Sequence, residues 1–363
     1  MIIKNINALG VYGGASLNSV ELALINTDGV DLHHVIKTAV VPYTETLAQD
    51  IRSVINKRLL DYKELETSIE VQRLKDKVST FYAEIIPPFV AENAVDVVGV
   101  DSLTIGCDAQ NHCSYQIENG RQICDLLGYK TITHFHKADL LSGGQASPLS
   151  AAFFNAIGQK IEKPVLFIDV GTISSLMYLG TTGELIAFDC APGVAMLEDW
   201  TFKHANMQTD YNGKLAATGK VNKQVLEALL KHKFLRQMPP KSLDIMSFSE
   251  KKEHLEGLSL EDGAATVTAF IAEAVFQAAL DFLPKIPGEI YLTGAGVKNP
   301  TLRRFLKQNF APRDIKTLAN LLTVGAASTA FNAVRRLYSL PITFPTTTGV
   351  CEPMTGGEIY EKN

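Results

Sequence analysis

A short acidic turn in the middle of the chain holds the residues best suited to phosphate chemistry. It reads Ile168-Asp169-Val170-Gly171-Thr172 and follows an apolar run. The carboxylate of Asp169 could hold a metal ion, and the backbone N–H groups of Gly171 and Thr172 could face phosphate oxygens. An ordinary hairpin, in which Asp169 caps its own turn, explains the segment equally well.

Two further glycine-rich turns lie earlier and later in the chain. They are Gly10-Val11-Tyr12-Gly13-Gly14-Ala15-Ser16-Leu17-Asn18 and Leu292-Thr293-Gly294-Ala295-Gly296-Val297-Lys298-Asn299. Taken alone, the segment 10–18 is better explained as a turn without a ligand. The G-x-G of the segment 292–299 is by itself weak evidence of a nucleotide site. Their order supports an ATP site: a phosphate loop (Gly13, Gly14, Ala15, Ser16, Asn18), a second phosphate loop (Asp169, Gly171, Thr172), and a loop that lets adenine approach the backbone (Gly294, Ala295, Gly296, Asn299).

The elements around these turns predict two α/β domains. Strand–turn–strand patterns cover 7–27 and 165–179, and a buried strand at 289–293 runs into the third turn. The spacing of apolar residues predicts helices within 44–93, 117–127, 221–234, 258–283 and 321–337. Because a similar hairpin stands near the start of each half, the domains should have related topology. The small residues of 325–333 fit close packing in the core or against a second copy in a homodimer.

Composition excludes several classes of protein. The net charge is −5 and the Lys-Arg pairs are isolated, so no nucleic-acid-binding surface is expected. The five Cys residues are scattered without a C-x-x-C pair, which is typical of reduced thiols in the cytoplasm. The start of the chain lacks the layout of a signal peptide. Polar residues interrupt the apolar stretch 264–280, so we expect a buried helix there and no membrane span.

Several collinear segments match the motifs of one family. Asp139 to Leu149 is the most specific, because it is similar to D-x-A-x-G-G-Q-G-A-P-L. Phe188 to Gly193, with Asp199-Trp200, is similar to F-D-x-G-P-G-N…D-x-W, and Pro239-Pro240-Lys241-Ser242 matches P-P-K-S. Gly294 to Leu302 is similar to G-G-G-x-x-N-x-x-L. Over nearly its whole length the chain thus resembles the anhydro-N-acetylmuramic acid kinases.

The resemblance implies two ribonuclease-H-like α/β domains around an ATP cleft, a fold of the sugar kinase/hsp70/actin type. It divides the chain into a first domain of residues 1–136 with a returning tail, 336–363, and a second domain of residues 137–335.

The resemblance also implies a reaction, as in the recycling of cell-wall muropeptides. ATP phosphorylates the 6-oxygen of 1,6-anhydro-N-acetylmuramic acid while water opens the anhydro ring at C1. Asp189 would take a proton from that water. Asp169 would hold Mg²⁺, which neutralises charge on the γ-phosphate. The sugar would contact two segments, Gly143-Gly144-Gln145 and Pro192-Gly193.

The chain departs from the family's pattern mainly on the sugar side. Asn18 stands where the family has Asp, and Val324 where it has an acidic residue. His134-Phe135-His136 replaces D-F-R, so a ring stands in place of an Arg. On a strand, His134 and His136 would share one face as a potential metal pair, although ordinary polar contacts are favoured. Two alternatives stay open beside the family's reaction: a kinase of another amino sugar or anhydro sugar, and a non-catalytic nucleotide-binding paralogue.

Overall fold

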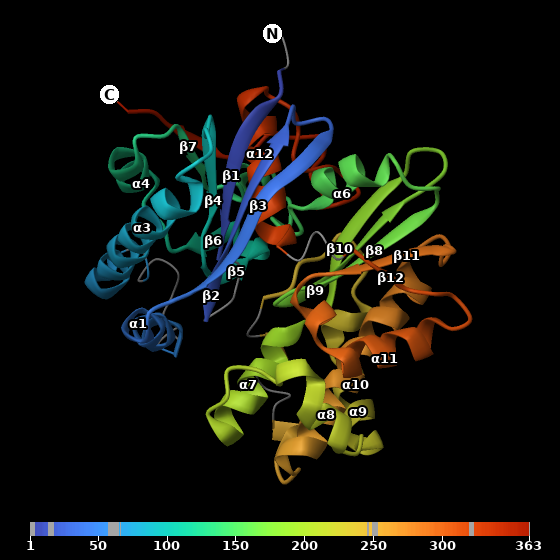
Figure 1. Ribbon diagram of the computed structural model, residues 1–363. Helices are drawn as coiled ribbons and strands as arrows, with labels where there is room; N and C mark the ends of the chain where they lie inside the picture. The colour runs from blue at the N-terminus through green and yellow to red at the C-terminus, as the bar shows by residue number, and fades with distance from the viewer. Residues whose placement is uncertain are drawn as a thin grey trace. The chain divides into compact units, whose positions relative to one another are not determined.

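The chain forms two compact units (Figure 1). The computed structural model describes residues 4–13, 18–56, 65, 67–244, 247–248, 253–318 and 323–362. Unit 1 comprises Met1–Ile157, Thr323–Pro345 and Gly349–Asn363, and unit 2 comprises Gly158–Leu322 and Thr346–Thr348.

Unit 1 is built on a six-stranded mixed sheet in the order β13-β7-β4-β1-β2-β3. β1 runs antiparallel to β2 and parallel to β4. The strands of this sheet are β1 (Ile6–Tyr12), β2 (Ser19–Thr27), β3 (Leu32–Pro42), β4 (Val97–Asp101), β7 (Thr131–Thr133) and β13 (Glu358–Tyr360). A separate hairpin is formed by β5 (Thr104–Asp108) and β6 (Cys113–Gln116).

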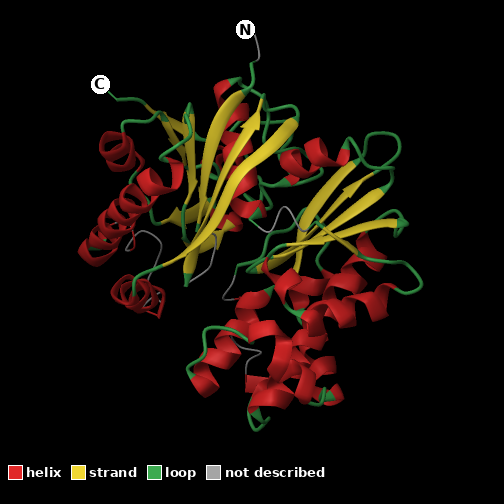
Figure 2. Ribbon diagram, viewed as in Figure 1, coloured by secondary structure: helices red, strands yellow, loops and turns green. Residues whose placement is uncertain are grey.

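Helices cover both faces of this sheet (Figure 2). They are α1 (Glu45–Asn56), α3 (Ile69–Val90), α4 (Gly120–Leu127), α5 (Lys137–Leu141), α6 (Ala151–Gly158) and α12 (Val324–Leu337). Successive side chains of a strand point to opposite faces. Leu9 and Val11 of β1 accordingly pack into a core shared with α1 and α3. Gly10 lies on the other face against α12, where an added Cβ would lie 1.8 Å from the carbonyl oxygen of Ala326.

Unit 2 repeats the same plan with five strands in the order β10-β9-β8-β11-β12. β8 runs antiparallel to β9 and parallel to β11, just as β1 relates to β2 and β4. The strands are β8 (Val165–Val170), β9 (Ile173–Leu179), β10 (Leu185–Pro192), β11 (Glu289–Thr293) and β12 (Lys316–Thr317). This shared order is that of the ribonuclease-H-like fold, so the predicted fold class is confirmed. The cleft predicted between the domains stays a prediction.

The helices of unit 2 pack around one long apolar helix. They are α7 (Val194–Ala205), α8 (Lys214–Thr218), α9 (Lys223–Leu230), α10 (Leu260–Phe282) and α11 (Pro300–Phe310). α10 is long and apolar enough to cross a membrane, with a mean hydropathy of 1.5, yet 78% of that window is buried inside the protein. An added Cβ at Gly263 would lie 2.0 Å from the Trp200 ring, so α7 and α10 are in close contact. The apolar stretch 264–280 is a core helix, as predicted.

The boundaries of the units differ from those predicted at 136/137 and 335/336. Residues 137–157 and 323–335 belong to unit 1, because α12 packs on β1 and β4. The Asn332 amide also donates to the carbonyl oxygen of Leu149 at 2.8 Å, which ties the segment before α6 to α12. The small residues of α12 are buried on their own sheet, which is one of the two interpretations left open for them. Thr346 belongs to unit 2 because its carbonyl accepts from the Ala187 N–H on the edge of β10.

Candidate active site

Asp189 lies at a bulge in β10 and is almost completely buried. The register of β10 on β9 shifts between Asp189, which is opposite Ser175, and Ala191. A bulge bends the strand and re-aims its side chains. The Ser175 hydroxyl donates to Oδ1 at 2.8 Å, and the Leu243 N–H donates to Oδ2 at 2.9 Å. The side chain predicted to act as a base is therefore fixed in orientation, and the residue is 1% exposed.

Asp169 lies on the same face of the sheet as Asp189. Ser175 of β9 is opposite Asp169 on one side and Asp189 on the other, and paired residues project to a common face. Burial, and secondly the charge of Asp189, raise the pKa of Asp169 to about 7. Its Oδ1 atom is buried and accepts no hydrogen bond from the described part of the chain. Two carboxyl groups thus flank one hydroxyl, and one of them has an unsatisfied oxygen.

Glycines bring the other predicted loops of unit 2 to the same end of the sheet. An added Cβ at Gly294 would lie 2.3 Å from Oδ1 of Asp169, and the backbone there has φ +81°. An added Cβ at Gly193 would lie 2.0 Å from the carbonyl oxygen of Gly171. The Gly193 N–H donates to the carbonyl of Thr172 at 3.0 Å. A side chain at either glycine would push these turns apart.

The remaining predicted residues of unit 2 border this cluster. Pro192 is the last residue of β10, and Ala295 and Gly296 lie in a 3₁₀ helix, η5 (Ala295–Lys298). Asn299 caps α11, because its Oδ1 accepts from the N–H groups of Thr301 and Leu302. The structure thus gives Asn299 a role in starting α11, and its contact with a nucleotide stays a prediction.

Lys241 holds the segment that donates to Asp189. Its ammonium donates to the carbonyls of Phe234 and Leu235 at 3.1 and 3.3 Å, near the end of the 3₁₀ helix η3 (Lys233–Arg236). It also lies 4.4 Å from the centroid of the Phe282 ring. Burial lowers the pKa of Lys241 to about 8. Its own carbonyl accepts from the Asp189 N–H at 3.1 Å, so this segment binds both the backbone and the carboxylate of Asp189.

The predicted first phosphate loop is described only at its ends. Gly14, Ala15 and Ser16 lie outside the described residues. The Gly13 N–H donates to the carbonyl of Asp101 at 2.9 Å, which joins the end of β1 to the end of β4. The Arg52 guanidinium donates to Oδ1 of Asn18 at 2.5 Å. The amide that replaces the family's Asp is therefore bound by a cation of its own unit.

The predicted sugar-binding segment, Gly143-Gly144-Gln145, forms a tight loop in unit 1 after α5. Gly143 is exposed, with φ +81°. The Gly144 N–H donates to the carbonyl of Asp139 at 2.9 Å, and an added Cβ at Gly144 would lie 2.1 Å from Oδ1 of the same residue. Asp139, the first residue of the most specific motif, therefore determines the shape of the loop.

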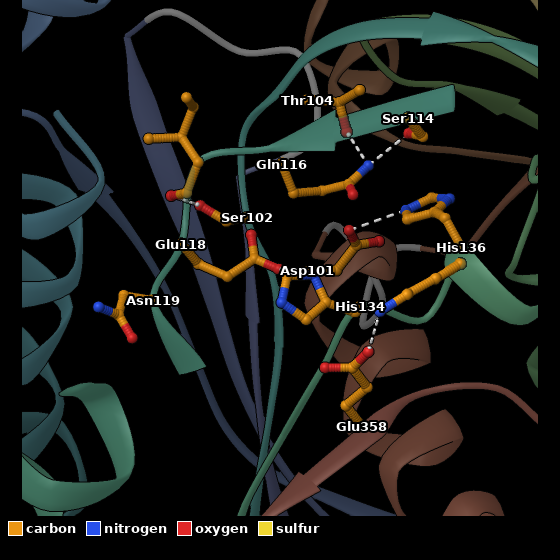
Figure 3. A network of polar contacts seen from close by, with 12 residues as sticks. Asp101, Ser102, Thr104, Ser114, Gln116, Glu118, Asn119, His134, His136 and Glu358 are labelled. Atoms are coloured by element: carbon orange, nitrogen blue, oxygen red, sulfur yellow. Dashed lines mark hydrogen bonds and ion pairs between the residues drawn. The ribbon is translucent and has the colours of Figure 1, made fainter. Parts of the chain in front are cut away.

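A polar network lies at the end of β4 (Figure 3). Nε2 of His136 contacts Oδ1 of Asp101 at 2.9 Å, and Nδ1 of His134 lies 3.4 Å from Oε1 of Glu118. Burial lowers the pKa of His134. Burial, and secondly the charge of Asp101, raise the pKa of Glu118 to about 8. At pH 7 we therefore expect a neutral His134 beside a largely protonated Glu118.

His134 and His136 do not lie on a strand, which the alternative of a metal pair required. β7 ends at Thr133, and His134 has φ +56°, which breaks the strand before either ring. The two rings contact different carboxyl groups, so the favoured interpretation, ordinary polar contacts, fits better than a metal pair. Among the residues that the structure describes, no group of three or more His, Cys, Asp or Glu side chains is placed to hold a metal ion.

Sequence reasoning missed Ser175, Glu118 and the role of Lys241. Ser175 could have been found by aligning the two strands around the Asp169 turn, because the hairpin fixes its register. Lys241 lies in a motif that was recognised, but its partners come from distant segments. Nothing in the local sequence marks Glu118 as buried, because the residues that cover it come from other elements.

Comparison with known proteins points to one family. Residues 6–362 match the family model described as anhydro-N-acetylmuramic acid kinase. A protein of that name from Paramagnetospirillum magneticum is 32% identical over 96% of this chain and 98% of its own length. Others from Rhodopseudomonas palustris and Rhizorhabdus wittichii are each 33% identical over 96% of this chain and 98% and 97% of their own lengths. Among solved structures, a ROK family glucokinase from Streptomyces griseus is 12% identical, with a TM-score of 0.44 over 90% of this chain and 99% of that one, which is too distant to add to the argument.

Proposed function

Because the chain belongs to the anhydro-N-acetylmuramic acid kinase family, we propose that it phosphorylates the 6-oxygen of 1,6-anhydro-N-acetylmuramic acid with ATP while water opens the anhydro ring at C1. Such an enzyme is an ATP-dependent phosphotransferase with a sugar hydroxyl as acceptor. The observation that carries the proposal is the row Asp169–Ser175–Asp189 across three strands of unit 2. It supplies a buried, oriented carboxylate beside a second one with an unsatisfied oxygen.

Asp189 is the proposed general base. The Ser175 hydroxyl and the Leu243 N–H donate to its Oδ1 and Oδ2 atoms and orient the carboxylate, which as an acceptor could take a proton from water. As water attacks C1, its proton moves to Asp189 and the C1–O6 bond breaks. O6 then bonds to the γ-phosphorus of ATP while the bond from that phosphorus to the β,γ-bridging oxygen breaks, which releases ADP. A positioned base typically contributes a factor of about 10²–10⁴ to such a step.

Asp169 is the proposed ligand of Mg²⁺, directly or through water. A carboxylate oxygen is the donor that Mg²⁺ prefers, and the unsatisfied Oδ1 of Asp169 fits this role. A bound cation would offset the burial and the Asp189 charge that raise the pKa of this group. When bound, the metal would supply charge neutralisation at the phosphates.

The turns beside Asp169 are the proposed phosphate and adenine contacts. Gly171, Thr172 and Gly294 lie at one end of the sheet, within reach of that carboxylate. In unit 1 we assign Gly13 and Asn18, with the undescribed Gly14, Ala15 and Ser16, to the phosphates. Gly143, Gly144 and Gln145 of unit 1, together with Pro192 and Gly193 of unit 2, are the proposed sugar contacts. We further propose that the enzyme works in the bacterial cytoplasm, with no nucleic-acid or membrane partner. A measurement of its mass in solution would test whether it forms a homodimer.

The test is to incubate the protein with Mg-ATP and 1,6-anhydro-N-acetylmuramic acid and to follow ADP and the sugar 6-phosphate by mass spectrometry. Asp189→Asn keeps the size of the side chain and removes the base, so we expect kcat to fall by at least about 10²-fold. Asp210→Asn is the matched control: Asp210 is also a buried carboxylate of unit 2, but it accepts from the N–H groups of Leu215 and Ala216. It should lower thermal stability without the same loss of kcat.

Each outcome has a distinct meaning. If the wild type forms ADP and the 6-phosphate and Asp189→Asn does not, both the reaction and the base assignment stand. If the wild type binds ATP by calorimetry but forms no sugar phosphate, the acceptor assignment fails, and other amino and anhydro sugars are tried. If ATP does not bind at all, the phosphate-loop assignment is wrong, and both the proposed kinase and the nucleotide-binding paralogue are excluded.

A further inference from the structure

Ala146 sits in a strained conformation that charged side chains hold from both sides. Its φ is +64°, a region that L-residues other than glycine seldom adopt and that costs about 1 kcal/mol or more. The residue is fully buried. Its N–H donates to Oδ1 of Asp139 at 2.7 Å, and its carbonyl contacts Nδ1 of His136 at 2.8 Å. A strained residue persists only where its surroundings determine it, and here two side chains do so.

His136 makes its second contact at the end of β4. Nε2 lies 2.9 Å from Oδ1 of Asp101, and the His136 side chain is 13% exposed. A backbone carbonyl can only accept a hydrogen bond, and an ionised carboxylate can only accept one as well. Both ring nitrogens must therefore donate, which requires the imidazolium form. A neutral ring could serve only one of the two partners.

The two partners of His136 belong to a loop and to the end of a strand. Ala146 closes the Gly143-Gly144-Gln145 loop, which we have assigned to the sugar. The backbone carbonyl of Asp101 accepts a hydrogen bond from the N–H of Gly13 at 2.9 Å, and Gly13 belongs to the first glycine-rich segment. In Figure 3 the side chains of Asp101 and His136 face each other, with Glu118 and His134 close by. One ring thus connects the loop 143–146 to Gly13 through the end of β4.

We propose that His136 is a positioning residue, whose imidazolium ties the loop 143–146 to the end of β4 and so fixes the acceptor-binding loop relative to Gly13. This inference rests on the proposed function in assigning the loop to the sugar. It differs from direct recognition, because both donors of His136 are occupied by the protein and none is left for a substrate. His136 therefore acts on the acceptor only through Ala146.

Two substitutions separate the two hydrogen bonds. The amide nitrogen of Gln reaches the place of Nε2, and that of Asn reaches the place of Nδ1. His136→Gln should keep the bond to Asp101 and release the Ala146 carbonyl, whereas His136→Asn should keep Ala146 and leave Asp101 unpaired. Loss of one charge-assisted hydrogen bond corresponds to a change of about tenfold or more. We expect His136→Gln to raise KM for the sugar about tenfold, with KM for ATP unchanged, and His136→Asn to lower thermal stability with a smaller change in KM for the sugar.

His33→Gln is the matched control in the same unit. Nε2 of His33 also lies near a carboxylate, 3.7 Å from Oδ2 of Asp28, at the start of β3. The control should lose an imidazole–carboxylate contact and keep the KM for the sugar.

Hydrogen exchange gives a readout that needs no turnover. Without substrate, amides of a peptide spanning 140–150 should exchange about tenfold faster in His136→Gln than in the wild type, His136→Asn or the control. If the wild type proves inactive, this exchange still tests the positioning role, so the failure of the proposed function can be told apart. The inference is overturned if His136→Gln exchanges at this loop like the wild type, or if KM for ATP and KM for the sugar rise together.

Discussion

Each unit contains a pair of interacting carboxyl groups, Asp101 with Glu118 in unit 1 and Asp169 with Asp189 in unit 2, and the surroundings of the two pairs differ. In unit 1, Asp101 pairs with His136 at 2.9 Å, and Glu118 lies 3.4 Å from His134. In unit 2, burial and Asp189 both raise the pKa of Asp169 to about 7. The ammonium of Lys241, which is near Asp189, donates to two backbone carbonyls instead.

The difference distinguishes a structural network in unit 1 from the proposed metal site in unit 2. A buried charge is tolerated when it is paired and hydrogen-bonded, as Asp101 is. The unsatisfied Oδ1 of Asp169 has no such partner among the described residues, so a bound cation would stabilise it. Functional sites often keep such unfavourable contacts, because the groups are arranged for the ligand and not for the free protein. Substitution of Asp169 should therefore change stability and activity in opposite directions, whereas substitution of Glu118 should change stability alone.

The largest effect is expected for Asp169→Asn. Without the proposed metal ligand, kcat should fall by about 10³-fold or more, and Mg²⁺ should no longer raise the melting temperature. The same substitution should stabilise the metal-free protein. The pKa of Asp169 is raised from 3.8 to about 7, so the folded state holds the proton more tightly, and its stability falls as pH rises between these values. Urea denaturation should show that the free energy of unfolding of Asp169→Asn equals that of the wild type near pH 4. At pH 8 it should exceed that of the wild type by roughly 1–4 kcal/mol.

Asp210→Asn serves as the opposite case within unit 2. The Asp210 carboxylate accepts two backbone hydrogen bonds, so Asp210→Asn should lower the free energy of unfolding and should not raise it at pH 8. If Asp169→Asn is also destabilised at pH 8, Asp169 is a compensated structural residue and the comparison between the units fails.

A smaller effect is expected for Lys241→Met. Met keeps the apolar stem among the aromatic rings but removes the ammonium that anchors the segment donating to Asp189. Leu243 should then orient the base less well, so kcat should fall about tenfold to a hundredfold while KM for ATP stays constant. Steady-state kinetics with both substrates varied would show this split.

Lys316→Met is the matched control for that substitution. The Lys316 ammonium also lies near a ring, 5.5 Å from the Tyr291 centroid, and pairs with Glu289 at 2.7 Å on the surface. A surface pair contributes about 0–1 kcal/mol, so both kcat and stability should hardly change. Equal losses of kcat in the two variants would show that Lys241 has no role in orienting Asp189.

The parts of this site that could be predicted are those carried by short segments. The Asp169 turn, the glycines and Asp189 each stand in a recognisable pattern, and the two-domain fold follows from hairpins repeated in each half. Those patterns depend on residues a few positions apart, so tertiary structure hardly alters them.

The parts that could not be predicted depend on distant partners. His134 and His136 alternate in the sequence, but a positive φ at His134 ends the strand. The predicted boundary at 335/336 cuts through α12, because nothing in its sequence shows that Gly10 and Gly99 of unit 1 form its packing surface. Burial of Glu118 likewise follows from packing of the other elements of unit 1.

The smallest effect, and the sharpest test of unit 1, is expected for Glu118→Gln. Burial raises the pKa of Glu118 from 4.5 to about 8, so the folded state keeps a proton that the unfolded chain loses, and stability falls as pH rises across that range. Gln resembles the protonated form, so the variant should match the wild type near pH 4.5 and be more stable by roughly 1–3 kcal/mol at pH 9. Turnover at pH 7 should be unchanged, because Glu118 is already largely protonated there. If thermal denaturation shows instead that the variant is less stable at every pH, an ionised Glu118 pairs with a charged His134.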